Sequence, residues 1–509
     1  MASFADEEKD LRAEETVIAS NSLYYISRYA SKFFFSFIVG VFLVRFLGPS
    51  GYGVYSLALV YWGMFSAIFS IGLGSTIQYA ISKYRAKKDL SSASWVVKRY
   101  LIILSLTAIL GSITMFFVSD SLASIYRLPE LGVILKILGI GLLFYSLSEN
   151  FSANVYIGYQ KMKYTFIVGV LYDVLRLAQV AVVILGFGLL GAIAFYDVIY
   201  LIVGLLSLYL VYRIIRKPQA AKPSDDKDLK EFRTYGKFSY ISNIVSFFYG
   251  SVMILLLGYF APNISSVAFY RAGLLMASLL SMPAAALMSA PFATTTKYLV
   301  RAEFDKFYRV QGVLLRYAAI VTIPLVIGAA VSAHELITYL YRSQFLGAQL
   351  PFQIILVSIL ITSMMSPLSF VLSAMGKQKY YMYSISAGAA VAIVSTVVLV
   401  PTLLSIGAAL TYLMSNMALL AVNIFFLSKQ IKIRIPYVAI MKSFGAAAVM
   451  GSYLYYILNI IPSLELLPFI LISGLMIYFV FAYLLKVITR SDIGFFLRLT
   501  HLYGILIRR

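Results

Sequence analysis

The chain has 509 residues, of which 61% are hydrophobic and only 12% charged. Soluble domains contain about 45–50% apolar and about 25% charged residues, because their surfaces must face water. The net charge of +21 would suggest a nucleic-acid partner in a soluble protein, but Lys and Arg also accumulate in the cytoplasmic loops of membrane proteins. The composition therefore excludes a soluble enzyme, a nucleic-acid-binding protein and a disordered scaffold, and it predicts a multi-pass membrane protein.

Apolar blocks of about 20 residues recur along the chain, and each is long enough to cross the roughly 30 Å hydrocarbon layer as a helix. Polar residues, glycine and proline separate the blocks. This pattern predicts an all-α, polytopic membrane protein with about fourteen transmembrane helices. The predicted spans are 20–46, 52–80, 96–118, 131–155, 164–187, 190–212, 238–260, 266–296, 312–332, 351–374, 380–400, 406–428, 437–459 and 467–487.

The distribution of basic residues predicts the orientation in the membrane. If the N-terminus is cytoplasmic, the cytoplasmic segments carry 32 Lys and Arg residues, whereas the exterior loops carry only Arg45, Arg127 and Arg342. Because cytoplasmic loops are enriched in Lys and Arg, both chain ends are predicted to be cytoplasmic. The acidic stretch MASFADEEKDLRAEE does not resemble a cleavable secretory signal, and the predicted location is the cell membrane.

Four short segments of the first half recur in the second half at nearly constant spacing. The matched residues, at offsets of 215 to 218, are Tyr55 with Tyr270, Arg99-Tyr100 with Arg316-Tyr317, Gly158, Gln160 and Lys161 with Gly376, Gln378 and Lys379, and Gly191, Ala192 and Tyr196 with Gly407, Ala408 and Tyr412. Six spans separate the copies, so both have the same orientation in the membrane. Parallel repeats of this kind predict two lobes, related by an axis along the membrane normal, that rock about a central binding site.

The repeat also predicts the domain organisation. Two lobes of six spans each are separated by a charged, proline-containing linker, and two further spans follow the second lobe. The predicted segments are a cytoplasmic N-terminal segment (1–19), an N-lobe (20–212), the linker (213–237), a C-lobe (238–428), the two further spans (429–487) and a basic cytoplasmic tail (488–509).

Ionisable residues inside membrane spans are costly and are therefore candidates for function. Arg28 and Lys32 lie four residues apart in the first span, on one face of a helix, and Arg271 lies near the start of the eighth span. These cations predict binding of an anionic substrate headgroup, since the planar fork of Arg matches phosphate. The alternative is that these side chains only extend to the membrane interface.

Four further ionisable residues lie inside predicted spans. Asp173 and Arg176 are three residues apart in the fifth span, so they could neutralise one another or take part in ion coupling. Asp197 and Glu149 are lone acids that could carry a proton or a cation, or hydrogen-bond to a neighbouring helix. The chain has no cysteine, which excludes thiolate metal sites. No cofactor, metal site or catalytic residue is predicted, and the choice between Na⁺ and H⁺ coupling stays open.

The segment RFLGPSGYGVYSLA at 45–58, which closes the first span and opens the second, resembles the signature turn of the Wzx-type polysaccharide and oligosaccharide flippases. The turn GYQKMKY at 158–164 and the segment LLGAIA at 189–194 are similar to that family as well. These flippases belong to the multidrug/oligosaccharidyl-lipid/polysaccharide (MOP) exporter superfamily, and the resemblance covers essentially the full chain.

This resemblance implies a flippase that moves a lipid-linked (polyprenyl phosphate or diphosphate) oligosaccharide from the cytoplasmic to the exterior leaflet by alternating access, for assembly of a surface polysaccharide or a glycoprotein glycan. It implies that Arg28, Lys32 and Arg271 lie in or near a basic cavity between the lobes, while the polyprenyl tail stays in lipid. The implied partners are this substrate, the lipid bilayer and glycan-assembly enzymes. A monomer is expected, and a nucleic-acid partner is not.

Two other functions remain open. A multidrug or cation antiporter of the same superfamily would need carboxylates in its cavity, whereas the first and eighth spans offer cations. A membrane glycosyltransferase or glycan polymerase would need a sizeable exterior loop with a pair of metal-binding acids, and the predicted exterior loops are short. The favoured prediction is a flippase rather than an enzyme.

Overall fold

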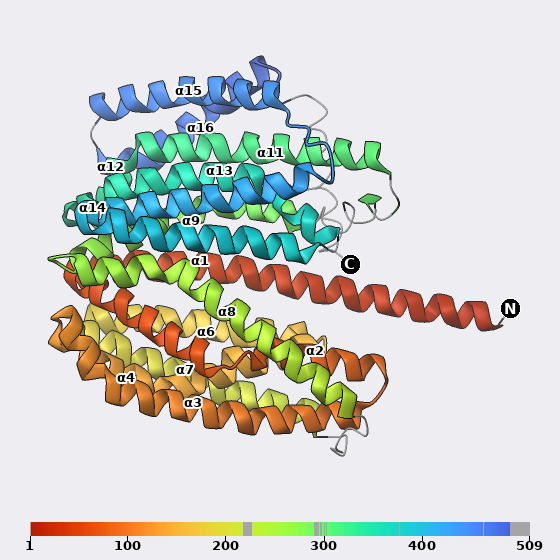
Figure 1. Cartoon of the computed structure of the whole chain (residues 1–509). Helices are drawn as coiled ribbons and strands as arrows, with labels where there is room; N and C mark the ends of the chain where they lie inside the picture. Colours follow the sequence, from red (N-terminus) through yellow and green to blue (C-terminus); the bar gives the residue numbers. More distant parts are fainter. Residues whose placement is uncertain are drawn as a thin grey trace. The chain divides into compact units, whose positions relative to one another are not determined.

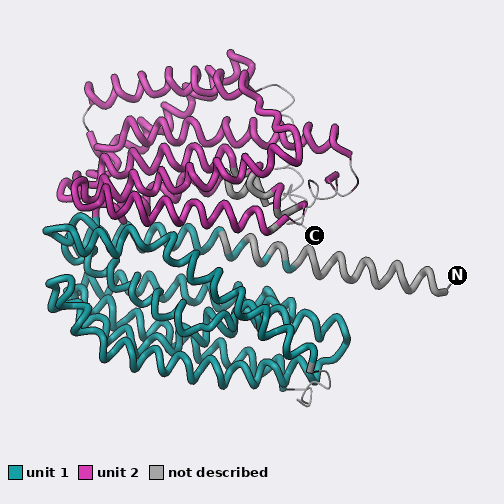
Figure 2. The backbone as a smooth tube through the Cα atoms, in the orientation of Figure 1, with its two compact units in different colours: residues 1–268 teal, residues 269–509 magenta. Residues whose placement is uncertain are grey.

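The computed structural model describes residues 2–216, 226–289, 303–375, 377–461 and 463–488, together with 295, 298, 299 and 301. All regular structure within these residues is helical, which confirms the predicted all-α polytopic fold (Figure 1). The chain divides into two compact units, residues 1–268 and 269–509 (Figure 2).

The described residues of the first unit form eight α-helices and two short π-helical stretches, and the second unit begins within α9. The elements of the first unit are α1 (Ala2–Phe69), α2 (Leu73–Ala86), α3 (Leu90–Tyr126), α4 (Pro129–Tyr145), η1 (Ser146–Ser152), α5 (Ala153–Gly158), α6 (Met162–Val182), η2 (Val183–Phe187), α7 (Gly188–Ile215) and α8 (Asp226–Phe260). Those that follow are α9 (Ser265–Ser289), α11 (Phe304–Val331), α12 (Ala333–Tyr341), η3 (Ser343–Ala348), α13 (Gln349–Ala374), α14 (Gln378–Ser428), α15 (Tyr437–Ile460), η4 (Leu464–Leu466) and α16 (Leu467–Leu484).

Eleven helical segments of the described chain are long and apolar enough to cross a membrane. Three of them contain a residue with non-helical backbone at which two helices meet: Gly48 in α1, Gly186 between α6 and α7, and Leu404 in α14. Each of these three is long enough for two crossings, so the described helices supply fourteen apolar segments, as the sequence predicts. At Gly48 the φ angle of 69° favours glycine, and Pro49 suits the start of the helix that follows.

In the first unit α3 packs against α4, α4 against α7, and α1 against α6. A buried apolar cluster joins α2, α3, η1, α7 and α8, and its fully buried members include Ile81, Val97, Phe151, Ile199 and Phe232. Lipid is as apolar as these side chains, so close packing and polar contacts decide which helices associate within the membrane.

Helix α8 lies along α2, and glycine lets the two helices approach closely (Figure 1). Gly72, which precedes α2, has a φ angle of 66°. A β-carbon at Gly72 would lie 2.6 Å from the carbonyl oxygen of Gly236 and 2.7 Å from the backbone nitrogen of Tyr240. The hydroxyls of Ser75 and Ser239 form a hydrogen bond across the same contact. Any larger residue at position 72 would therefore push α8 away from α2.

The start of α8 differs from the linker that the sequence predicts at 213–237. The helix begins at Asp226, because its charged first turns also carry an apolar face. On that face Leu229 packs against the buried cluster of the first unit, and Phe232 belongs to it and is fully buried. Because the stretch also contains many charged residues of both signs, its apolar face is not evident from the composition. Residues 217–225 of the predicted linker lie outside the described residues.

In the second unit α13 packs against α11 and α14, and α15 packs against α11 and α16. The hydroxyl of Tyr478 in α16 donates to the carbonyl oxygen of Ile320 in α11 at 2.9 Å. Arg316 of α11 donates through Nε and Nη2 to the carbonyl oxygen of Val487, at 3.2 and 2.6 Å. The two helices beyond the predicted repeat are therefore fastened to α11.

Backbone hydrogen bonds recur in the two units, but in the turn before α6 the structure equates Lys161 with Lys377, two residues before the Lys379 that the sequence match pairs with it. In the turn before α6, Lys161 N donates to Tyr156 O and Tyr164 N donates to Lys161 O, and 216 residues later Lys377 N donates to Leu372 O and Tyr380 N donates to Lys377 O. Arg127 and Arg342 are 215 residues apart, and each follows a helix with a positive φ angle, 55° and 69°, although their ψ angles of 36° and 168° differ. These turns indicate a structural repeat within the described residues. The matched Gly376 lies outside them.

The N-terminus of α3 provides a prediction on stability and pH. The side chain and the backbone N–H of Ser92 hydrogen-bond to the Asp89 carboxylate and lower its pKa. A carboxyl with a lowered folded pKa stabilises the fold above its unfolded pKa of about 4, and this contribution is lost as the pH falls through the folded pKa. Asp89→Ala is therefore expected to lower the free energy of unfolding by about 1 kcal/mol at pH 7 and by less at low pH. Thermal unfolding of the purified protein and of Asp89→Ala measures this loss of unfolding free energy. An equal loss at pH 7 and at low pH would contradict the prediction.

Candidate functional site

A buried ion pair joins α1 and α6 inside the first unit. Arg28 Nη1 donates to Asp173 Oδ2 at 2.5 Å, and Ser31 Oγ donates to the same oxygen at 2.7 Å. The Asp173 side chain is 2% exposed and the Arg28 side chain 14% exposed. Arg28 lies across Gly169, where a β-carbon would come within 1.8 Å of Arg28 Nε. The charge of Arg28, a predicted substrate contact, is thus compensated within the unit.

This pair corrects the partner that sequence spacing suggests for Asp173. Spacing of three residues on α6 favours Arg176, but Asp173 pairs with Arg28 of α1 instead. Arg176 donates through Nη1 to the hydroxyl of Tyr55 at 3.1 Å, and its guanidinium lies 5.0 Å from the centroid of the Tyr196 ring. Lys32, one turn beyond Arg28 on α1, is exposed.

Five aromatic residues of α1, α4, α6 and α7 pack together beside Arg176 and form what we call the aromatic cluster: Trp62, Tyr145, Tyr172, Tyr196 and Tyr200. The ring centroid of Trp62 lies 4.3 Å from that of Tyr145, 5.3 Å from that of Tyr196 and 5.2 Å from that of Tyr200. Sequence reasoning missed this cluster, because its members come from four helices and the chain has 40 tyrosines. The one available signal was Trp62, since tryptophan occurs only twice.

The two lone acids of the first unit lie in different surroundings. Asp197 of α7 is half-buried against the backbone of α4, where a β-carbon at Gly141 would come within 2.1 Å of Asp197 Oδ1. Glu149 is exposed and lies in the π-helical stretch η1. Such stretches are rare and frequent at functional sites. Both acids remain candidates for a proton or cation, and neither pairs with Arg28.

The third predicted substrate contact, Arg271, belongs to α9 in the second unit. It is half-buried, and its Nε atom is buried without a hydrogen-bond partner among the described residues. A buried donor that lacks an acceptor is costly. The Arg271 guanidinium is therefore a candidate to bind an acceptor atom of a ligand.

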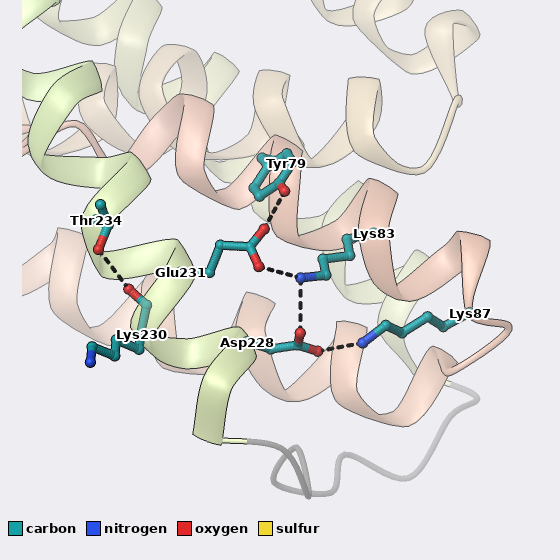
Figure 3. Close-up of polar contacts among 7 residues, drawn as sticks. All are labelled: Tyr79, Lys83, Lys87, Asp228, Lys230, Glu231 and Thr234. Atoms are coloured by element: carbon teal, nitrogen blue, oxygen red, sulfur yellow. Dashed lines mark hydrogen bonds and ion pairs between the residues drawn. The ribbon is translucent and has the colours of Figure 1, made fainter.

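A charge network at the predicted cytoplasmic side links α2 to the first turns of α8 (Figure 3). Lys83 Nζ lies 2.9 Å from Asp228 Oδ1 and 2.7 Å from Glu231 Oε2, and Lys87 Nζ lies 2.8 Å from Asp228 Oδ2. The hydroxyl of Tyr79 donates to Glu231. Hydrogen bonds with Asp228 and Glu231 raise the pKa of the Lys83 ammonium above its usual value, so this cation stays charged at neutral pH. Sequence reasoning did not find the network, because its two sides are more than 140 residues apart.

The membrane-embedded polar groups of the described residues include arginines, a lysine and tyrosine hydroxyls, which suit recognition of oxygen-rich, negatively charged groups, and the acids Asp173, Asp197 and Glu149. Within the described ranges no three His, Cys, Asp or Glu side chains are grouped so as to hold a metal ion.

Solved structures share this fold at low sequence identity. The lipid II flippase MurJ in an inward closed conformation is 12% identical with a TM-score of 0.73, and the match covers 91% of this chain and 98% of that one. An inward-facing multidrug resistance MATE family transporter of the MOP superfamily is 17% identical with a TM-score of 0.65, covering 80% and 97%. A MOP superfamily transporter from Pyrococcus furiosus is 17% identical with a TM-score of 0.54, covering 81% and 95%.

Sequence comparison identifies the family. No curated protein matches the chain at a significant level. The profile of a family described as polysaccharide biosynthesis protein matches residues 18–296, more than half of the chain, from within α1 to beyond the end of α9. This match confirms the family resemblance that the sequence shows, and the solved structures add that the fold is one found in transporters. The chain is a multi-pass membrane protein that belongs to the polysaccharide biosynthesis protein family.

Proposed function

We propose that the protein is a flippase that moves a lipid-linked oligosaccharide, carried on a polyprenyl phosphate or diphosphate, from the cytoplasmic to the exterior leaflet by alternating access. The observation that carries this proposal is the family match over residues 18–296. It is supported by the fold, which is shared along most of the chain with a flippase of another lipid-linked precursor. The protein acts in this proposal as a transporter and not as an enzyme, in the cell membrane and as a monomer.

The membrane-embedded charges fit an anionic cargo. Lys32 is exposed on α1, and Arg271 of α9 has a buried donor atom without an acceptor among the described residues. A phosphate or diphosphate entering the membrane loses its hydration, and cations held inside the protein replace those lost interactions. The polyprenyl tail needs no such shelter, since it is soluble in the lipid.

An antiporter of organic cations is the second candidate, because the fold is also shared with a multidrug resistance transporter. Such a protein needs a carboxylate that is free to meet the cation. Asp173, the most deeply buried membrane acid of the first unit, is occupied by Arg28 and Ser31. Asp197 and Glu149 are better placed than Asp173 to couple transport to Na⁺ or H⁺. Because the membrane-embedded cations fit an anionic cargo, we favour a flippase over an antiporter of organic cations.

Removal of the protein from its cells is expected to cause a lipid-linked oligosaccharide to accumulate on the cytoplasmic leaflet, because synthesis continues while export stops. Mass spectrometry of extracted lipids identifies the glycan, the carrier and the number of phosphates. The intact gene should clear the lipid, Arg271→Ala should not, and Arg342→Ala, which removes an exposed cation beside η3, should clear it as the intact gene does. Unchanged lipids after removal, together with altered efflux of organic cations, would favour the antiporter instead.

A further inference from the structure

The first unit holds one membrane-embedded guanidinium whose charge nothing in the described chain neutralises. Arg28 is paired with Asp173, whereas the described neighbours of Arg176 are phenols: it donates to the hydroxyl of Tyr55, lies over the face of the Tyr196 ring and interacts with Tyr172. Among the residues that the structure describes, no carboxylate forms an ion pair with Arg176. A cation inside a membrane protein normally pairs with an acid or marks the path of a ligand.

The groups around Arg176 are hydrogen-bond donors and carry no negative charge. Trp62 is only 4% exposed, and its Nε1 atom is buried without a hydrogen-bond partner among the described residues. A buried indole N–H usually has an acceptor, so its position marks a place where an acceptor is missing. The hydroxyls of Tyr172 and Tyr196 lie 3.4 Å apart and can turn their hydrogens toward a third group.

Arg176 and Trp62 approach the same aromatic side chain. The guanidinium lies 5.0 Å and the indole ring 5.3 Å from the centroid of the Tyr196 ring. A guanidinium, an indole N–H and phenol hydroxyls together match an oxyanion, and the faces of aromatic rings match the apolar face of a sugar. Glu149, four residues after Tyr145, is close enough to interact electrostatically with Tyr145 and Tyr200, and its carboxylate is an acceptor for sugar hydroxyls.

We infer that Arg176, Trp62 and the hydroxyls of Tyr172 and Tyr196 bind an oxyanion carried next to a sugar, and that the aromatic cluster contacts the sugar ring. The oxyanion is the phosphate of the lipid carrier or the carboxylate of an acidic sugar, which share this chemistry. The inference rests on the proposed function and gives the first unit its own substrate contact. Arg28, held by Asp173, then serves to position α1 against α6.

The chain provides its own optical reporter for this site. Its two tryptophans are Trp62 and Trp95, so Trp95→Phe leaves Trp62 as the only indole in the protein. We would titrate the full-length Trp95→Phe protein in lipid nanodiscs with inorganic diphosphate, with glucuronate and with glucose. Saturable change in Trp62 emission is expected for at least one of the two anions, at concentrations at least tenfold lower than for neutral glucose.

Matched variants in the Trp95→Phe background test the role of the guanidinium. Arg176→Gln should weaken anion binding at least tenfold, whereas Lys136→Gln, which removes a cation paired with the exposed Asp120 elsewhere in the first unit, should leave it unchanged. Arg176→Lys keeps the charge but loses the planar fork, and it should bind the anion with intermediate affinity. This variant still tests the inference if Arg176→Gln does not fold.

The three ligands separate the sources of the oxyanion. A response to diphosphate alone identifies the carrier phosphate, and a response to glucuronate alone identifies an acidic sugar. The inference is overturned if neither anion changes Trp62 emission, if glucose binds as tightly as glucuronate, or if the arginine variants bind the anion like the parent. A different result would refute the proposed function. In that case anions bind at Arg176, but no lipid-linked oligosaccharide accumulates when the protein is removed.

Discussion

A disulfide between cysteines introduced at Ser75 and Ser239 is expected to stop transport, and reduction of that disulfide is expected to restore it. The hydroxyls of the two serines touch across the contact between α2 and α8, and the chain has no cysteine of its own to interfere. Alternating access requires the two predicted repeats to separate on one side of the membrane at a time. Helix α8 opens the second predicted repeat, whereas α2 belongs to the first.

The contact between these helices lies within the first compact unit, residues 1–268, so its opening would separate α8 from the other helices of that unit. Gly72 brings α2 against the backbone of α8, Phe232 is fully buried, and Lys83 and Lys87 hold Asp228 (Figure 3). The side chains of Lys83 and Lys87 are 22% and 48% exposed, whereas that of their partner Asp228 is 7% exposed, so separating the two helices would uncover a buried carboxylate together with Phe232. A disulfide between positions 75 and 239 prevents this separation.

A second pair of cysteines provides the control for this experiment. Asp120 and Lys136 form an ion pair between α3 and α4, which both belong to the first predicted repeat. A short bifunctional thiol reagent should cross-link Asp120→Cys to Lys136→Cys, because it replaces the length of the Lys136 side chain, and should leave the transport rate unchanged. If the protein cross-linked at Ser75→Cys and Ser239→Cys transports at the normal rate, α2 and α8 do not separate during the cycle and the prediction is refuted.

Loss of the Asp173 carboxylate is expected to destabilise the first unit strongly. Asp173→Ala leaves Arg28 as an uncompensated, mostly buried cation, and breaking a buried ion pair by removing one partner costs about 3–5 kcal/mol. Removing Arg28 as well should recover part of this loss, with a coupling free energy of about 1–3 kcal/mol. Thermal unfolding of the purified single variants and of the Arg28→Gln, Asp173→Ala double variant measures these quantities.

The exposed acid Asp120 provides the matched comparison. Its side chain is 72% exposed, so Asp120→Ala should change stability by less than about 1 kcal/mol even though it also breaks an ion pair. Additive effects of Arg28→Gln and Asp173→Ala would contradict the pair as described. Arg28 would then become available again as a substrate contact, as the sequence predicts.

The sequence predicts the helices of this protein well, because each span has to satisfy its own backbone and bury its own length in lipid. The turn at Gly48 and Pro49 shows this. The non-helical backbone of Gly48 and the proline after it mark the boundary between two spans, and regular helix lies on each side of them. The turn before α6 also has a matched segment in the second half of the sequence, although the structure shifts that match by two residues, from an offset of 218 to one of 216. Both kinds of feature are local, and local chemistry is what the sequence displays directly.

Partners across helices could not be predicted in the same way. Asp173 has an arginine three residues away on its own helix, yet it pairs with Arg28, 145 residues distant, because the smooth surface at Gly169 lets that side chain lie against α6. Lys83 meets Asp228 only because α8 starts earlier than its charged sequence suggests. The choice of partner depends on how the helices pack, and no spacing along one helix contains that information.

The most direct test of the proposed function is translocation by the purified protein in liposomes. A lipid-linked oligosaccharide is placed in both leaflets, and a glycosidase added outside removes the glycan that it can reach. With the protein present, almost all of the glycan should be removed, and with the Ser75→Cys, Ser239→Cys protein in its oxidised form only the outer half. If the inner half stays protected at the same level with and without the protein, this chain is not a flippase for that substrate.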